Sequence, residues 1–261
     1  MKIKFSIITV VLDDIQGLKK TYASLLRQSN KTYEWIVKDG GSKDEAIEFL
    51  ESLSDKVKWV SQKDNGIYDA MNHGIALSSG DYVVFMNAGD VFHDSEVLAN
   101  VAEAVCSSEQ ETGILFGGAK LSFPQSGHII YRPPRRSEVS LWHGLPANHQ
   151  ATYYQRNLLE RTRYDLQYPL CGDYFLTASL LKNGAASNYI DKPLAIFEVG
   201  GQSYKKIGQL FAEPYRIQRD VLGIPLHYRL ASAIKRFVST AGFIVLSQSI
   251  FFMKIRKGNK K

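Results

Sequence analysis

Cysteine is scarce in this sequence: its 261 residues include only Cys106 and Cys171, which lie far apart and show no metal-type spacing. The scarcity excludes a disulfide-rich scaffold and favours a reducing cytoplasmic setting. The chain also lacks a long apolar stretch with a small-residue cleavage site near its amino terminus, because residues 1–5 lead straight into a strand-like segment. We therefore expect no signal peptide.

Three motifs that would indicate other enzyme classes are missing. No Gly-x-Gly-x-x-Gly follows the first predicted strand, which argues against a dinucleotide cofactor. No Gly-x-x-x-x-Gly-Lys loop is present to bind nucleotide phosphates, and no Gly-x-Ser-x-Gly element indicates a hydrolase. The hydrophobic content of 44% is nevertheless ordinary for a globular protein with a buried core.

Acidic residues are absent after Asp220, whereas eight lysines and arginines follow it. The net charge of +6 therefore combines −2 over residues 1–220 with +8 over residues 221–261. A basic segment favours nucleic acid or an anionic membrane surface as a partner, and a solvated end without a partner is the alternative. We predict a main domain at 1–220 and a basic amphipathic extension at 221–261.

Within this extension, residues 237–253 form a stretch of 17 residues without a charge. A spanning helix needs about 20 predominantly apolar residues, so the stretch favours a helix that lies in the membrane interface. Its basic flanks would meet anionic headgroups, which predicts a protein peripheral to the inner, cytoplasmic face of the cell membrane, with no nucleic acid as partner. A helix packed on the main domain is the alternative.

Strand-like and helix-like segments alternate through the first 90 residues. Short apolar runs alternate with stretches whose apolar residues recur at helical spacing. The predicted strands are 5–12, 33–38, 57–61 and 82–86, and the predicted helices are 15–28, the stretch after a capping Ser42, and 67–77. This order predicts an α/β fold with a mostly parallel sheet flanked by helices and a Rossmann-like nucleotide-binding half. Later segments at 114–121 and 128–131 are typical of an antiparallel pair, 194–199 of a strand, and 173–181 and 207–221 of helices.

An acid follows each of three successive predicted strands: Asp39, Asp64 and Asp90. The carboxyl ends of parallel strands meet at one edge of a sheet, where such folds bind ligands. Carboxylates there can accept hydrogen bonds from a base or a ribose, or bind a hard cation. Each acid alone is more often a turn or cap residue, and Asp90 is the candidate cap of a helix starting near Asp94. The three together favour a nucleotide site.

Several segments resemble family 2 glycosyltransferases with the GT-A fold. The opening strand Phe5-Ser-Ile-Ile-Thr-Val-Val and the segment Lys38-Asp-Gly-Gly-Ser-Lys-Asp44 are similar to their first two conserved elements. Further similar segments are Asp64-Asn-Gly-Ile-Tyr-Asp-Ala-Met-Asn-His-Gly74, Asn87-Ala-Gly-Asp90, Asn148-His-Gln-Ala-Thr-Tyr153 and Cys171-Gly-Asp-Tyr-Phe-Leu176. The resemblance covers about residues 3–203 and is nearest to the colanic acid and capsule exopolysaccharide glycosyltransferases. The combination and order of these segments are more specific than any one of them.

On the donor side, the resemblance implies a nucleotide site and a metal site. The nucleotide would be bound by Thr9, Asp39, Gly40 and Asp64. Asp39 would accept an N–H of the base, and Asp90 would hold Mg²⁺ or Mn²⁺ against the diphosphate. The chain departs from the family pattern at Asn87 and Gly89, where relatives often have acids, and this weakens the expected metal binding.

On the acceptor side, the resemblance implies that Asp173 is the general base, while His149 and Gln150 line the acceptor or diphosphate region. A carboxylate that removes the acceptor proton during attack contributes roughly 10²–10⁴-fold to the rate. A cation stabilises the charge that develops on the leaving diphosphate. The alternatives are that Asp173 caps a helix at 174–181 and that His149 is a buried structural histidine.

These features predict an inverting glycosyltransferase that moves a sugar from a nucleotide-diphosphate sugar to a hydroxyl of a lipid-linked glycan in surface polysaccharide biosynthesis. A sugar nucleotidyltransferase is one alternative, but it should show a glycine-rich basic loop after the first strand, and Val10-Val-Leu-Asp-Asp14 does not supply one. A non-catalytic nucleotide-sugar or glycan-binding module is another. Asn87 and Gly89 favour that module, whereas Asp173 opposes it, because binding alone needs no base. The residues do not fix the sugar, the nucleotide, the linkage or the oligomeric state.

Overall fold

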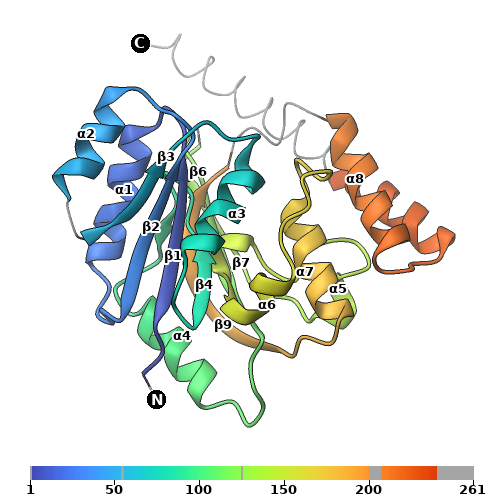
Figure 1. Ribbon diagram of the computed structural model, residues 1–261. Coiled ribbons are helices and arrows are strands. Elements are labelled where there is room, and N and C mark those ends of the chain that lie inside the picture. Colours follow the sequence, from blue (N-terminus) through green and yellow to red (C-terminus); the bar gives the residue numbers. More distant parts are fainter. Residues whose placement is uncertain (1, 54–55, 125, 200–206, 240–261) are drawn as a thin grey trace, which may run out of the picture.

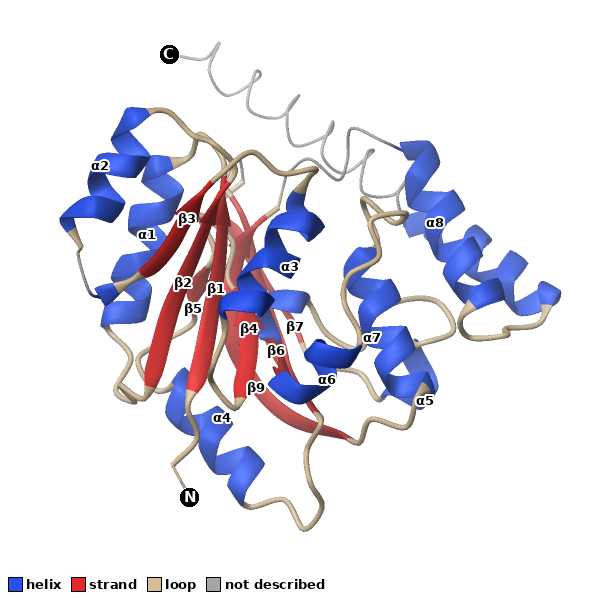
Figure 2. Ribbon diagram, in the orientation of Figure 1, coloured by secondary structure: helices blue, strands red, loops and turns tan. Residues whose placement is uncertain are grey.

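The computed structural model describes residues 2–53, 56–124, 126–199 and 207–239. In these residues a curled, mixed nine-stranded sheet runs through the molecule with helices on both faces (Figure 1; Figure 2). The strand order is β3-β2-β1-β4-β8-β6-β9-β5, and β7 pairs with β6. The strands are β1 (Phe5–Val11), β2 (Tyr33–Asp39), β3 (Lys58–Ser61), β4 (Tyr82–Phe85), β5 (Val91–Phe92), β6 (Ile114–Phe123), β7 (His128–Arg132), β8 (Thr152–Gln155) and β9 (Ser187–Glu198). The helices are α1 (Ile15–Leu26), α2 (Asp44–Ser52), α3 (Ile67–Leu77), α4 (Val97–Cys106), α5 (Ser137–Ser140), α6 (Arg156–Arg161), α7 (Gly172–Lys182) and α8 (Ile207–Asp220).

The amino-terminal half of the sheet is parallel. β1 lies between β2 and β4 and pairs in parallel with both, and β2 pairs in parallel with β3. Every residue of β1 and β4 is buried, which explains their unbroken apolar and β-branched composition. The predicted strands and the parallel arrangement are therefore confirmed, and the carboxyl ends of these strands share one edge.

Two hydrophobic cores lie on opposite faces of this parallel half. Alternate residues of β1 divide between them: Ile7 belongs to the core under α1 and α4, and Ile8 to the core under α3 and α7. Gly74 brings α3 close to the sheet, because a Cβ at this position would collide with Ile8 Cγ2. The two covered faces leave the edges of the sheet as the places where polar side chains can gather.

The carboxyl-terminal half joins the parallel half through antiparallel pairs. β8 pairs antiparallel with both β4 and β6, and the predicted pair 114–121 with 128–131 is confirmed as β6 and β7. β9 is longer than the predicted strand at 194–199, because it pairs in parallel with β6 from Ser187 onward. Since β8 runs opposite to β4, the 3₁₀ turn His149–Ala151 that precedes β8 lies at the carboxyl end of β4.

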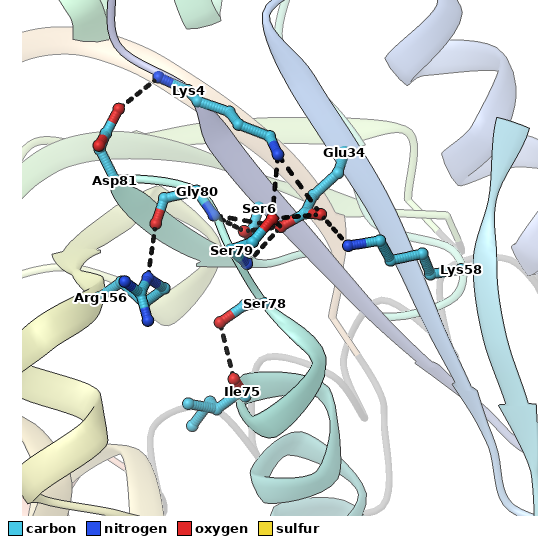
Figure 3. Close-up of polar contacts among 10 residues, drawn as sticks. All are labelled: Lys4, Ser6, Glu34, Lys58, Ile75, Ser78, Ser79, Gly80, Asp81 and Arg156. Atoms are coloured by element: carbon cyan, nitrogen blue, oxygen red, sulfur yellow. Dashed lines mark hydrogen bonds and ion pairs between the residues drawn. The ribbon is translucent and has the colours of Figure 1, made fainter.

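Glu34 joins the strands at the opposite, amino-terminal edge (Figure 3). Its Oε1 accepts hydrogen bonds from Ser6 Oγ at 2.6 Å and Gly80 N–H at 3.1 Å, and its Oε2 accepts from Lys58 Nζ at 2.6 Å. Burial raises the pKa of Glu34, but hydrogen bonds from Lys58, Ser6 and Ser79 outweigh burial and lower the pKa to about 2. The partners come from β1, β3 and the turn before β4, so the network holds the strand starts in register.

The described part of the carboxyl-terminal segment is helical. α8 continues through Pro214, and residues 226–239 are helical and pack back on α8, where Gln218 Nε2 donates to Ser232 Oγ at 2.8 Å. Residues 240–261, and with them most of the predicted interfacial stretch at 237–253, lie outside the described residues. Among the helices that are described, none has the length and apolarity needed to cross a membrane.

Candidate active site

Asp39 ends β2 at the carboxyl edge of the sheet, and its side chain is buried. Its Oδ2 accepts hydrogen bonds from Gly41 N–H at 3.0 Å, Ser42 N–H at 2.9 Å and Ser61 Oγ at 2.6 Å. Burial raises the pKa of Asp39, but these hydrogen bonds outweigh it and hold the pKa below its ordinary value of 3.8. The other oxygen, Oδ1, is buried and has no hydrogen-bond partner among the described residues. One oxygen thus fixes the carboxylate, and the other can accept a donor from a ligand.

Asp64 lies beside Asp39 because a buried lysine holds both. Lys38 Nζ donates to the carbonyl of Asp39 at 2.6 Å, to the carbonyl of Gln62, and to Asp64 Oδ2 at 3.3 Å. A Cβ on Gly40 would lie 3.0 Å from Asp64 Oδ2, so glycine permits this close approach. The structure therefore brings together three of the four residues predicted to bind a nucleotide, and their contact with one stays a prediction.

Thr9, the fourth of these residues, is placed differently. It is fully buried, and its Oγ1 accepts a hydrogen bond from Trp35 Nε1 at 2.9 Å. By alternation along β1 its side chain shares a face with Ile7 and Val11, which belong to the core under α1. The Thr9 hydroxyl therefore bonds to the core, and its predicted contact with a base stays a prediction.

Asp90 lies in the turn between β4 and β5 and is 8% exposed. Its Oδ2 accepts hydrogen bonds from Asn87 N–H at 3.1 Å and Gln150 Nε2 at 3.2 Å. Thr21 of α1 fixes the turn, because its hydroxyl donates to the carbonyl of Asp90 at 2.7 Å and accepts from Gly89 N–H at 3.0 Å. Burial raises the pKa of Asp90 to about 7. The buried carboxylate would be more readily ionised beside a cation.

The surroundings of Asp90 fit one weakly held cation. Asp90 does not cap the following helix, since α4 begins at Val97. No cluster of three or more Asp, Glu, His or Cys side chains suited to a metal occurs in the described ranges. Two residues that hydrogen-bond to Asp90 carry an amide oxygen, Asn87 Oδ1 and Gln150 Oε1, that is buried and has no partner in the part of the chain that the structure describes. One carboxylate and two amide oxygens suit Mg²⁺ or Mn²⁺ when phosphate and water oxygens complete the shell.

Asp173 lies in the first turn of α7. The N-cap position is Cys171, so Asp173 is not the cap of this helix. Its Oδ1 accepts hydrogen bonds from Tyr174 N–H at 2.8 Å and from the Tyr68 hydroxyl at 3.3 Å. Burial raises the pKa of Asp173 above its ordinary value of 3.8, although His149 and these hydrogen bonds oppose the rise. A carboxylate with a raised pKa is a stronger base.

His149 lies between Asn87 and Asp173. Its Nε2 is 3.3 Å from Asn87 Nδ2, and its Nδ1 is 3.8 Å from Asp173 Oδ2. Burial lowers the pKa of His149, so the ring is neutral at pH 7. With the Asn87 amide donating to Nε2, the ring proton resides on Nδ1 and faces the carboxylate. The ring therefore connects the turn that carries Asp90 with the helix that carries Asp173.

Two consecutive residues join these two acids. His149 contacts Asp173, and Gln150 contacts Asp90, because the turn His149–Ala151 lies at the end of β4. A pocket of about 550 Å³ lies elsewhere, lined by Gly80, Asp81 and others. Gly80 and Asp81 precede β4 whereas Asp90 follows it, so that pocket is at the opposite edge and is not part of this site.

Sequence reasoning missed two residues that hold Asp173 in place. Tyr68 of α3 donates to it, although Tyr68 lies within a segment that carries the family resemblance. Glu213 of α8 is buried, and its Oε2 accepts hydrogen bonds from Leu170 N–H at 3.0 Å and Cys171 N–H at 2.8 Å. These bonds fix the turn that leads into α7. Glu213 belongs to no motif, so only its burial could have revealed it.

Comparison with known proteins gives a consistent family match. Residues 6–175 match the family described as Glycosyl transferase family 2. Over 181 residues the chain is 31% identical to an uncharacterized glycosyltransferase of Mycobacterium tuberculosis, covering 67% of this chain and 69% of that protein. Over 216 residues it is 28% identical to a PGL/p-HBAD biosynthesis glycosyltransferase of Mycobacterium bovis, covering 76% of this chain and 78% of that protein. The predicted likeness to colanic acid enzymes stays a prediction.

Solved structures share the fold at low sequence identity. S. aureus TarS 1-349 in complex with UDP-GlcNAc matches with a TM-score of 0.68 at 17% identity, covering 90% of this chain and 73% of that chain. The mannosyltransferase PcManGT from Pyrobaculum calidifontis, in complex with GDP-Man and Mn²⁺, matches with a TM-score of 0.62 at 13% identity, covering 97% and 81%. The predicted α/β fold of the GT-A type is thereby confirmed.

Proposed function

Because the chain belongs to glycosyltransferase family 2, we propose that it transfers a sugar, with inversion, from a nucleotide-diphosphate sugar to a hydroxyl of a lipid-linked glycan. One observation carries the proposal: His149 contacts Asp173 and its neighbour Gln150 contacts Asp90. A base for the acceptor and a carboxylate for the donor diphosphate therefore lie on either side of one short turn.

The nucleotide is assigned to Asp39, Gly40 and Asp64. The unpartnered Oδ1 of Asp39 would accept an N–H of the base, while its Oδ2 stays bonded to the protein. Asp64 would accept from the base or the ribose, since its side chain is 14% exposed. TarS and PcManGT were solved with UDP-GlcNAc and GDP-Man, which supports a nucleotide-sugar donor here.

The donor diphosphate is assigned to the turn after β4. Asp90, Asn87 and Gln150 would hold Mg²⁺ or Mn²⁺ through one carboxylate and two amide oxygens. When bound, the cation supplies positive charge that stabilises the departing nucleoside diphosphate. Thr21 keeps this turn in position through its bonds to the carbonyl of Asp90 and the N–H of Gly89. The Mn²⁺ in the PcManGT complex supports this assignment.

The proton transfer is assigned to Asp173. Tyr68 and the N–H of Tyr174 hold its Oδ1, which leaves Oδ2 to accept the proton of the acceptor hydroxyl. As the acceptor oxygen bonds to the anomeric carbon, the bond from that carbon to the diphosphate oxygen breaks, and the diphosphate leaves with the electron pair. Attack from the side opposite the leaving group inverts the anomeric centre.

The described start of the extension supports docking at the cytoplasmic face of the membrane. In the helix 226–239, Ile234, Phe237 and Val238 are each more than 60% exposed, and basic side chains accompany them at Lys235 and Arg236. Apolar groups beside lysine and arginine suit an anionic lipid surface. A lipid-linked acceptor would give the enzyme a reason to bind there.

A donor screen followed by product analysis tests the function. UDP-, GDP- and dTDP-sugars are compared by thermal shift, because a ligand at about 100 times its Kd stabilises the fold by about 2.7 kcal/mol. The best donor is then assayed for transfer and hydrolysis, and the anomeric configuration of the product is read by NMR. Binding without turnover would indicate a binding module, synthesis of the sugar nucleotide a nucleotidyltransferase, and a retained anomer would refute the inverting step.

A further inference from the structure

A basic pocket of about 520 Å³ adjoins the acceptor side of the site. Its walls come from residues 132–148, from the helix 226–239 and from one residue of α8. No lining residue comes from β1–β4 or from the turns that carry Asp39, Asp64 and Asp90, so the pocket is separate from the donor half. Asn148 lines it and immediately precedes His149, which places the pocket next to the contact between His149 and Asp173.

Three cationic side chains converge in this pocket on one histidine. Lys235 Nζ lies 3.0 Å and Arg135 Nη1 3.5 Å from His143 Nε2, while Arg236 Nη2 donates to the carbonyl of His143 at 2.9 Å. Burial and then these three cations lower the pKa of His143 to about 4. The ring is therefore neutral at pH 7 and adds no charge, but it holds the cations close together.

No acid compensates these charges within the described ranges. Among the residues that the structure describes, no carboxylate lies within 4.0 Å of Arg135, Lys235 or Arg236, and none lines the pocket. Like charges held together in a concave site repel one another, and an anion that binds between them relieves the repulsion. Arginine forks suit the oxygens of phosphate in particular.

We propose that this pocket binds a phosphate or diphosphate group carried by the acceptor, an inference that rests on the proposed transfer reaction. The position of the pocket favours a phosphate of the acceptor over one of the donor, because the donor diphosphate is assigned to the turn of Asp90 on the other side of His149. A glycan joined to a lipid through phosphate would present its anion to Arg135, Lys235 and Arg236 and a sugar hydroxyl to Asp173. The pocket would thus bind the phosphate end of the acceptor and position its sugar hydroxyl for the reaction.

Pyrophosphate titration of the full-length protein tests the pocket without any transfer reaction. Calorimetry is done in EDTA, which removes the cation that the proposed donor site needs to hold a diphosphate. Each of Arg135→Gln and Arg236→Gln should weaken pyrophosphate binding about tenfold, since each removes a charge-assisted hydrogen bond. Arg136→Gln is the matched control, because Arg136 is an exposed neighbour that does not line the pocket. It should bind pyrophosphate like the wild type.

Several outcomes would overturn the proposal. One is an absence of pyrophosphate binding. Another is an equal loss of pyrophosphate affinity in the Arg136→Gln control, which would show that binding reflects general charge attraction. A third arm uses vesicles of phosphatidylglycerol or phosphatidylcholine: if Arg135→Gln weakens binding to phosphatidylglycerol alone and leaves pyrophosphate unaffected, the pocket serves a lipid headgroup instead. Arg135 is exposed, so Arg135→Gln should fold normally even if Arg236→Gln does not. This titration involves no sugar transfer. The proposed anion site can therefore be refuted while the transferase activity is confirmed, and the transferase activity can be refuted while the anion site is confirmed.

Discussion

Replacing Asp173 by asparagine tests the proposed base directly. Asparagine keeps the size of the side chain and can keep the oxygen that accepts from Tyr68 and from the N–H of Tyr174. It cannot accept the acceptor proton. A positioned general base contributes roughly 10²–10⁴-fold, so kcat for transfer should fall by about that factor. The donor KM should change by less than about threefold, because the nucleotide half is untouched.

The stability of the Asp173→Asn variant separates a catalytic role from a structural one. Burial raises the pKa of Asp173, which means that the fold disfavours the ionised form. At neutral pH the native carboxylate therefore costs stability, and removing its charge should leave the melting temperature equal or higher. A variant that loses both activity and melting temperature would show that Asp173 holds the structure instead.

The pH profile gives a second, independent reading of Asp173. A base must be ionised, so kcat/KM should fall as the pH decreases through the raised pKa of Asp173. Tyr68→Phe removes a donor that lowers this pKa, so the acidic limb should shift to higher pH. Asp165→Asn is a control, because Asp165 lies before α7 and its side chain accepts a hydrogen bond only from the N–H of Gln167 in the described chain. Turnover of Asp173→Asn within about threefold of the wild type would refute the assignment.

Three further predictions concern other parts of the chain. EDTA should suppress transfer, Mg²⁺ or Mn²⁺ should restore it, and Asp90→Ala should weaken binding of a nucleoside diphosphate more than of a nucleoside; full activity in EDTA contradicts this. Glu34→Gln should lower the free energy of unfolding by about 1–3 kcal/mol at neutral pH. The wild type should lose the same stabilisation as the pH falls from 4.5 to about 2, because the pKa of Glu34 is lower in the folded state than in the unfolded state. Urea titrations at several pH values measure it, and an unchanged pH dependence in the variant contradicts it. Ile234→Ser with Phe237→Ser should reduce co-sedimentation with phosphatidylglycerol vesicles while Val139→Ser, equally exposed at 65%, should not.

The parallel half of the fold could be predicted because its residues obey local rules. β1 and β4 are buried on both faces, so their composition is apolar throughout and their ends are marked by polar turns. Once the strands are parallel, their carboxyl ends share an edge, and the positions of Asp39, Asp64 and Asp90 follow from the order of the elements. The predicted gathering of acids at the edge depended on topology alone.

The remaining features depended on tertiary contacts that a sequence pattern does not contain. Ser42 was predicted to cap a helix, but its Oγ accepts from Asp13 N–H at 2.7 Å, because the two turns meet across the sheet edge. Thr9 is predicted to bind the base, and the structure adds a hydrogen bond that its hydroxyl accepts from the Trp35 indole. Glu213 supports Asp173 from α8, 43 residues after Leu170. In each case the polar partner is distant in sequence, so spacing could not reveal it.

Buried or hydrogen-bonded carboxylates lie at both edges of the parallel sheet, but their oxygens are not equally satisfied. At the amino edge, both oxygens of Glu34 accept hydrogen bonds, and its low pKa is that of a carboxylate that stabilises the fold. At the carboxyl edge, Asp39 Oδ1, Asn87 Oδ1 and Gln150 Oε1 are buried without a partner in the described part of the chain. An unsatisfied buried acceptor costs about 1–3 kcal/mol, and a ligand that donates to these oxygens or coordinates them would offset that cost. Under the proposed function, the base and the cation of the donor would supply the partners that these oxygens lack.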